Sequence, residues 1–160
     1  MHGHKRGLVG DEERDAAVGW MRALNRAAAD TLRPFSPSAV TDVTGFGLLG
    51  HAHETASRSG VRIRLDAERL VPLAGALEVA RAGERTGGDA RNRAFVGERV
   101  SVDGVADELV ALAFDPQTSG GLLVALPTER AATLRAAFDG AALHLARIGT
   151  VEEGEGVVLA

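Results

Sequence analysis

The chain has 160 residues, of which 45% are hydrophobic, and its formal net charge is −4. That content is enough for one domain with a single core, residues 1–160, and too little for two independent enzymatic lobes. The negative charge argues against a nucleic-acid partner, and no apolar run reaches the roughly 18 residues of a membrane span, so we expect a soluble, cytoplasmic protein. The absence of cysteine excludes disulfides, thiolate metal sites and thiol nucleophiles.

The first third of the chain predicts two helices with a short strand between them. One amphipathic helix is predicted over 11–33, because it begins with three acidic residues and ends before Pro34. Residues 38–43 are β-prone, and a helical pattern resumes at Phe46 and ends at Gly60. The apolar face of the first helix consists of Ala17, Trp20, Met21, Leu24, Ala28 and Leu32.

The middle of the chain predicts a strand, a helix and a long loop. Apolar and charged residues alternate over 61–65, which is typical of a strand with one buried face. Pro72 is placed to begin a helix that ends at Gly83. Residues 84–104 lose all periodicity and predict a polar loop, and such loops inside compact domains are usually functional or mobile.

The carboxy-terminal third mixes helices and strands without regular alternation. The run 122–126 is apolar throughout and predicts a central strand, and Thr128 is expected to cap the helix that follows it. The irregular order favours an α+β fold, with a mixed β-sheet packed with helices. The predicted elements are a helix over 105–112, a strand over 122–126, a helix over 128–138, and strands over 143–148 and 157–159.

The string TDVTGFGLLGH at 41–51 is the first candidate site. A strand ends at Asp42, passes through a glycine turn and enters a helix, whose free amide groups and positive dipole can hold an anion. Magnesium prefers one or two carboxylates with water and phosphate oxygens, so we predict Asp42 as a metal ligand and Thr44, Gly45 and Gly47 as phosphate-side residues. A helix-capping role for Asp42 is the structural alternative, and the glycine spacing does not match a Walker loop.

The string DPQTSGG at 115–121 is the second candidate site. A structural turn explains its composition adequately, but its hydroxyls and paired glycines would also let backbone amides approach a ligand or a neighbouring domain. Residues 86–92 are predicted to be a flexible, solvated loop. None of the five histidines is assigned a role, and the pair at 51 and 53 would point in different directions on a helix. The candidate residues of this second site are Asp115, Thr118, Ser119, Gly120 and Gly121.

Both strings, together with a GG-x-x-x-N element at Gly87, Gly88 and Asn92, resemble the carboxy-terminal domain of selenophosphate synthetase, also called selenide, water dikinase. The resemblance runs over nearly the whole chain and implies the fold of the carboxy-terminal domain of aminoimidazole ribonucleotide synthetase. It implies a homodimeric, two-domain enzyme that uses Mg²⁺ and makes selenophosphate from selenide, ATP and water, releasing AMP and phosphate. The metal aspartate of this domain in the family falls on Asp42.

The chain also departs from the family pattern. It has no counterpart of the amino-terminal domain, which in the family supplies the essential lysine, the cysteine or selenocysteine and most metal-binding aspartates. One carboxylate and one helix end cannot organise a triphosphate for in-line transfer, so we expect no catalytic residue here and no activity in isolation. Asp89 stands where relatives have threonine, which puts a ligand role for 87–92 in doubt. A noncatalytic partner-binding module and a domain of another ATP-dependent enzyme of the superfamily remain alternatives.

Overall fold

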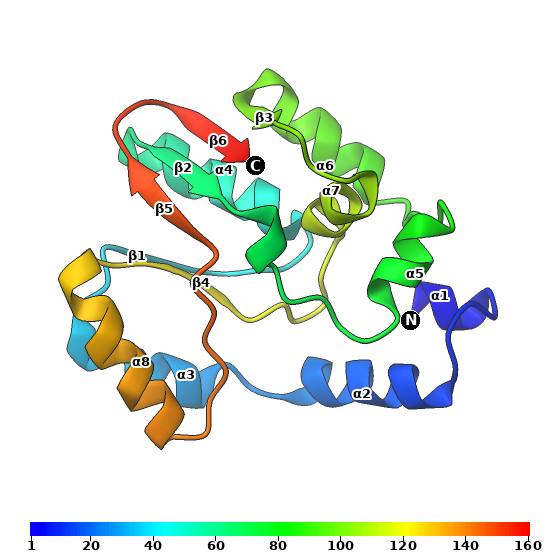
Figure 1. The fold of residues 1–160 in the computed structure, drawn as a ribbon, viewed down its shortest axis with the longest axis horizontal. Coiled ribbons are helices and arrows are strands. Elements are labelled where there is room, and N and C mark those ends of the chain that lie inside the picture. Colours follow the sequence, from blue (N-terminus) through cyan, green and yellow to red (C-terminus); the bar gives the residue numbers. More distant parts are fainter.

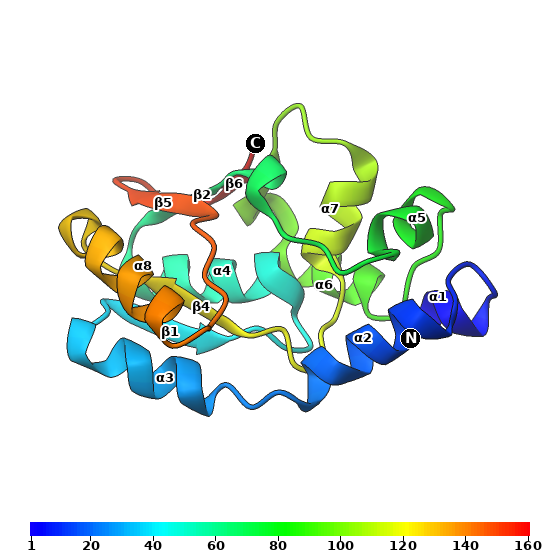
Figure 2. The same cartoon turned by 60° about the horizontal axis from the view of Figure 1, so that its bottom comes forward.

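Helix α4 (Gly47–Ser59) lies at the centre of the fold in the computed structural model, which describes residues 1–160 (Figure 1). A four-stranded sheet packs on one side of this helix and a two-stranded ribbon on the other (Figure 2). Gly60 ends the helix with a left-handed backbone, as the sequence predicted. The residues that α4 buries are Gly47, Leu49, Gly50, His51, Ala52, His53 and Ala56.

The four-stranded sheet is mixed, which confirms the predicted α+β fold. Its order is β3-β6-β2-β5, in which β6 is parallel to both β3 and β2, and β5 is antiparallel to β2. The alternating pattern of β2 buries Ile63 and Leu65 against the core. The four strands are β2 (Arg62–Leu65), β3 (Val100–Val102), β5 (Gly149–Glu152) and β6 (Gly156–Leu159).

The two-stranded ribbon pairs β1 (Ala39–Asp42) with β4 (Leu122–Ala125) in antiparallel register, so that Asp42 lies opposite Leu122. Leu123 packs on the main core, whereas Val124 packs on a second cluster between α3 (Arg26–Leu32) and α8 (Ala131–Gly140). The prediction of a central strand at 122–126 is wrong, because β4 has one partner strand. Its unbroken apolar run reflects packing on both faces, not pairing on both edges.

Four more helices form one flank of the fold. Helix α7 (Asp107–Phe114) packs against α4, α5 (Ala76–Arg81) and α6 (Asp89–Val96). Helix α1 (His2–Lys5) lies beside α5, where Gly3 contacts Val79. No helix combines the length and apolar character that a bilayer-crossing segment needs. The short 3₁₀ turns are Arg33–Phe35, Ala67–Arg69, Gly97–Arg99 and Thr128–Arg130.

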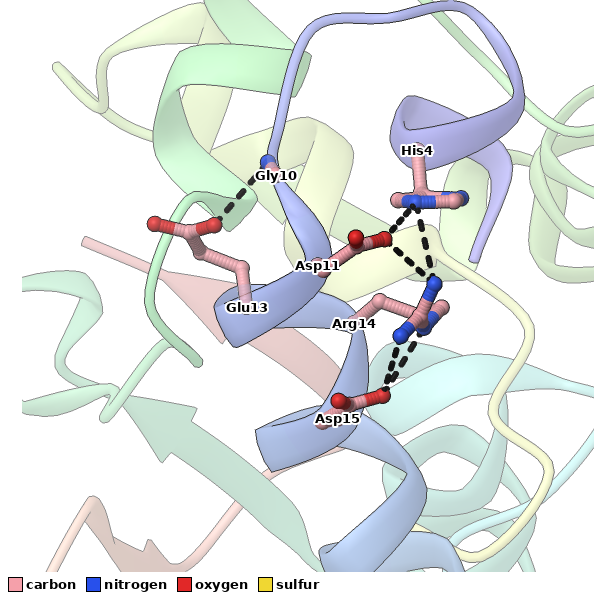
Figure 3. Close-up of polar contacts among 6 residues, drawn as sticks. All are labelled: His4, Gly10, Asp11, Glu13, Arg14 and Asp15. Atoms are coloured by element: carbon pink, nitrogen blue, oxygen red, sulfur yellow. Dashed lines mark hydrogen bonds and ion pairs between the residues drawn. The ribbon is translucent and has the colours of Figure 1, made fainter.

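The single helix predicted over 11–33 is wrong. Helix α2 (Asp11–Arg22) ends where Ala23 becomes extended, and α3 follows as a separate helix. Helix α2 buries no residue, and Trp20 and Leu24 are 55% and 82% exposed. Local polar contacts shape its first turn instead: the Glu13 carboxylate accepts from Gly10 N–H, and Arg14 pairs with acidic neighbours (Figure 3).

Four further predictions are also corrected. The segment 84–104 contains α6 and β3 in place of a structureless loop; α6 buries the polar residues Asp89 and Asn92, which hid it from a hydrophobic pattern. Residues 143–148 form no strand, because Leu143 and Leu145 pack on the α3–α8 cluster as an extended chain without a ladder partner. Helix α5 begins after Pro72, and Thr128 opens a 3₁₀ turn without a side-chain cap.

Candidate functional site

Three segments that are far apart in the sequence meet where β1 turns into α4. Residues 44–46, four residues between positions 88 and 95, and Pro116 line one open groove of about 630 Å³. Each of these segments lies in or next to one of the three elements that carry the family resemblance. The lining residues are Thr44, Gly45, Phe46, Gly88, Arg91, Asn92, Phe95 and Pro116.

Backbone hydrogen bonds lock the second string onto the first. Val43 N–H donates to Gly121 O at 2.9 Å, and Gly120 N–H donates back to Val43 O at 2.9 Å. Gln117 N–H donates to Thr44 O at 3.0 Å. A Cβ on Gly120 would lie 2.8 Å from Val43 O, so this glycine is required by the close approach of the two strings. The DPQTSGG loop therefore continues the β1–β4 pairing beyond the strands.

Asn92 ties the third segment to the same corner. Its side chain is 4% exposed, and its Nδ2 donates to Gly45 O at 3.0 Å and to Phe114 O at 2.9 Å. The amide thus joins the glycine turn to the end of α7. Composition and periodicity gave no role to this residue; the GG-x-x-x-N element was the one signal that marked it.

His51 holds the corner from the helix side. Its Nε2 accepts a hydrogen bond from Thr44 N–H at 3.0 Å, and Thr44 Oγ1 lies 3.2 Å from the same nitrogen. The imidazole is buried, and its Nδ1 lies 3.7 Å from Glu54 Oε2. Sequence reasoning left this histidine unassigned, because a partner seven residues earlier, outside the helix, carries no periodic signal.

The amino end of α4 meets the carboxyl end of α7. Gly47 has a φ of +68°, and a Cβ there would lie 2.8 Å from Phe114 O and 3.0 Å from Asp115 O. Gly47 N–H donates a hydrogen bond to Thr44 O at 3.0 Å. The amides of Gly45 and Phe46, in contrast, have no acceptor within the chain. Both residues line the groove, so these two amides are donors that this corner can offer to a ligand.

Asp42 is exposed at the end of β1, and its carboxylate makes no hydrogen bond or ion pair within the chain. Strand alternation puts it on the face of the ribbon that carries Val124, away from α4. It does not line the groove. The chain contains no group of three acidic or histidine side chains that could hold a metal ion by themselves.

The Asp115 side chain connects two loops. Its Oδ1 accepts from Thr86 Oγ1 at 3.4 Å and its Oδ2 from Gln117 Nε2 at 2.9 Å. Burial raises the pKa of the Asp115 carboxyl, the Asp89 charge adds to the increase, and the hydrogen bonds from Thr86 and Gln117 oppose it. Thr118 is exposed, and the side chains of Thr118 and Ser119 make no hydrogen bond within the chain.

Aromatic rings form one wall of the groove. Phe46 and Phe95 stack with centroids 4.9 Å apart and an interplanar angle of 16°. His51 meets Phe46 edge-on at 5.6 Å, and His53 meets Phe95 edge-on at 5.9 Å. These contacts fasten α6 to the amino-terminal half of α4. Sequence reasoning missed the pair, because two phenylalanines 49 positions apart give no local pattern.

Comparisons with known proteins agree with this architecture. Over 144 residues the chain is 41% identical to "Selenide, water dikinase" of Porphyromonas gingivalis, covering 90% of this chain and 41% of the relative. It is 39% identical over 159 residues to the protein of that name from Nitratidesulfovibrio vulgaris, covering 96% and 44%. The crystal structure of thiamine-monophosphate kinase from Stenotrophomonas maltophilia has a similar fold, with a TM-score of 0.53, 24% identity, and coverage of 80% of this chain and 32% of that one.

The chain thus spans about two fifths of the length of the curated relatives it matches. The relatives confirm the resemblance that the strings at 41–51 and 115–123 carry. Residues 6–160 match the family described as "AIR synthase related protein, C-terminal domain", and the chain belongs to that family.

Proposed function

We propose that this chain is the carboxy-terminal domain of an ATP-dependent selenide, water dikinase, which makes selenophosphate from selenide, ATP and water and releases AMP and phosphate. The similarity to relatives of that name over nearly the whole chain carries this proposal. The interlocking of all three resembling segments around one groove supports it.

Asp42 is proposed to be a Mg²⁺ ligand. Mg²⁺ takes one or two carboxylates and fills its remaining positions with water and phosphate oxygens. The Asp42 carboxylate fits this use, because it is exposed and has no partner within the chain. Since the chain offers no group of three acidic or histidine side chains, the other ligands would come from ATP and from the amino-terminal domain of the longer enzyme.

The turn after Asp42 is proposed to face the phosphates. Gly45 and Phe46 offer backbone amides without an internal acceptor, and the positive end of the α4 dipole lies behind them. Three residues of chain span at most about 11 Å, so a metal held at Asp42 stays within reach of a phosphate at Gly45. Thr44 and Gly47 shape this turn, and Asp115, Thr118, Ser119, Gly120 and Gly121 form its supporting loop and a docking edge for the other domain.

The remaining parts of the proposal concern the whole enzyme. The amino-terminal domain of the longer enzyme would supply the lysine, the nucleophile and the other metal aspartates. The isolated chain is therefore expected to be inactive, and the complete protein to be a cytoplasmic homodimer. Magnesium-dependent ATP titration of the isolated chain should give weak binding at best.

The test is the variant Asp42→Asn in the two-domain enzyme, with selenide-dependent AMP formation as the readout. Loss of a metal ligand should lower kcat/KM by on the order of 100-fold or more. Asp103→Asn is the matched control, because Asp103 is also exposed at the end of a strand and lies outside the groove. Equal turnover of Asp42→Asn and the control would remove Asp42 from the mechanism. A two-domain protein that never consumes ATP in the presence of selenide would favour a noncatalytic partner-binding module.

A further inference from the structure

Two buried side chains, His51 and Asn92, hold the turn Thr44–Gly45–Phe46. Asn92 donates to Gly45 O, and the His51 ring contacts both flanks: its Nε2 accepts from Thr44 N–H, and its edge meets the Phe46 ring. His51 is 6% exposed, so bulk water does not compete for these contacts. Two of the three residues of the turn therefore depend on the chemical state of one imidazole.

The protonation state of the His51 imidazole follows from the group that donates to it. A backbone N–H can only donate, so the Nε2 atom that faces Thr44 N–H at 3.0 Å must carry a lone pair and no proton. A neutral imidazole with an unprotonated Nε2 has its proton on Nδ1. The Glu54 carboxylate lies on that side of the ring, 3.7 Å from Nδ1, and its negative charge favours a proton there.

We propose that His51 is a positioning residue for the Asp42–Gly47 corner, acting as a neutral, Nδ1-protonated imidazole that accepts Thr44 N–H. By taking the Thr44 amide, it fixes the turn so that the next two amides, those of Gly45 and Phe46, remain free at the groove. The inference deepens the proposed function and rests on it for the catalytic consequence. The tautomer and the turn geometry stand independently of the reaction.

The first experiment uses the 160-residue chain and needs no substrate. Nitrogen-15 NMR of the imidazole should show that His51 carries its proton on Nδ1 and none on Nε2. Hydrogen exchange of the Thr44 amide should be slow in the wild type and in His51→Gln, whose side-chain oxygen reaches about as far as Nε2 and can accept the same bond. In His51→Leu, which keeps bulk and loses the acceptor, the exchange should be at least about 10-fold faster. A proton on Nε2, or equal exchange in all three proteins, would overturn the inference.

The second experiment uses the two-domain enzyme and selenide-dependent AMP formation. His51→Leu should lower kcat by about 100-fold with a smaller change in the KM for ATP, because it misplaces the turn without removing a contact to ATP. His51→Gln should recover most of the lost kcat. His144→Leu removes an exposed imidazole that lies outside the groove and does not contact Thr44, and it should keep wild-type kcat.

The outcomes separate the two proposals. A wild-type enzyme that turns over selenide and is matched by His51→Leu would overturn the positioning role and leave the proposed function intact. A wild-type enzyme without selenide-dependent activity would refute the proposed function, while the tautomer and the exchange of Thr44 would still decide the inference about the turn. A loss that His51→Gln does not recover at all would also contradict the assigned acceptor role.

Discussion

Helices α2 and α4 are nearly equal in length, with 12 and 13 residues, and both have an amphipathic sequence. Helix α4 lies between two sheets and buries seven residues, whereas α2 runs along the outside of the molecule and buries none (Figure 2). Helix α2 is held by contacts among neighbours, such as Asp11 with Arg14 and Gly10 with Glu13 (Figure 3). Periodicity therefore predicts that a segment is helical, but not how much its apolar face stabilises the fold.

The largest expected effect is on the free energy of unfolding, in a comparison of two leucines. Leu49 is 0% exposed in the main core, and Leu49→Ala should lower the free energy of unfolding by about 3 to 5 kcal/mol, through lost burial and a cavity. Leu24 follows α2 and is largely exposed, so Leu24→Ala should change the free energy of unfolding by less than about 0.5 kcal/mol. Urea denaturation of the isolated chain measures both. A comparable loss for Leu24→Ala would show that the apolar face of α2 is covered in solution.

An intermediate effect compares two glycines. Gly47 has a positive φ and lies against the carbonyls of Phe114 and Asp115, so Gly47→Ala should cost roughly 2 to 4 kcal/mol through backbone strain and overlap. Gly19 is inside α2 with no atom within 4 Å of an added Cβ, so Gly19→Ala should stabilise by about 0.5 to 1 kcal/mol. Thermal or urea unfolding should move in opposite directions for the two variants. Destabilisation by Gly19→Ala would mean that α2 packs on something at that position.

The smallest effects concern two carboxyls with opposite pKa changes. Burial raises the pKa of Asp115, whereas a hydrogen bond accepted from His4 and the Arg14 charge lower the pKa of Asp11, both from the ordinary value of 3.8. The folded chain therefore holds the Asp115 proton more tightly, so the stabilisation linked to it is present below the unfolded value and is lost as pH rises through the folded value. For Asp11 the stabilisation is present above the unfolded value and is lost as pH falls through the folded value.

Carbon-13 NMR titration of the chain measures both carboxyl pKa values directly. Asp115 should titrate above 3.8 and Asp11 below it. Asp115→Asn should remove the loss of stability that accompanies ionisation at position 115, and Asp11→Asn should remove the gain at position 11. A depressed pKa for Asp115 would show that its hydrogen bonds from Thr86 and Gln117 outweigh its burial.

Segments with a strong local pattern were predicted well. The alternation of β2, the glycine-terminated helix α4 and the apolar strand β4 all appear close to their expected places, because each is written in consecutive residues. Helix α6 was missed because the side chains it buries include Asp89 and Asn92. The break between α2 and α3 was missed because the apolar spacing continues from Met21 to Leu24, although the backbone at Ala23 is extended.

In the candidate site, too, local motifs were predicted from the sequence and long-range contacts were not. Sequence reasoning singled out both strings, and the structure shows that Gly120 and Gly121 of the second string hydrogen-bond to Val43 of the first. It did not anticipate that the Thr44 amide is taken by His51 or that Asn92 clamps Gly45. Those contacts join residues separated by 7 and 47 positions, and no periodicity records them.

The sequence by itself determined the α+β class, most of the regular elements and the strings that place the chain in its family, because these depend on local spacing and on the order of residues. The tertiary structure alone decided which apolar faces are buried, that β4 has one partner, and which backbone amides of the turn after Asp42 remain free. Burial and hydrogen-bond pairing are properties of two surfaces in contact, and a single segment specifies one of those surfaces.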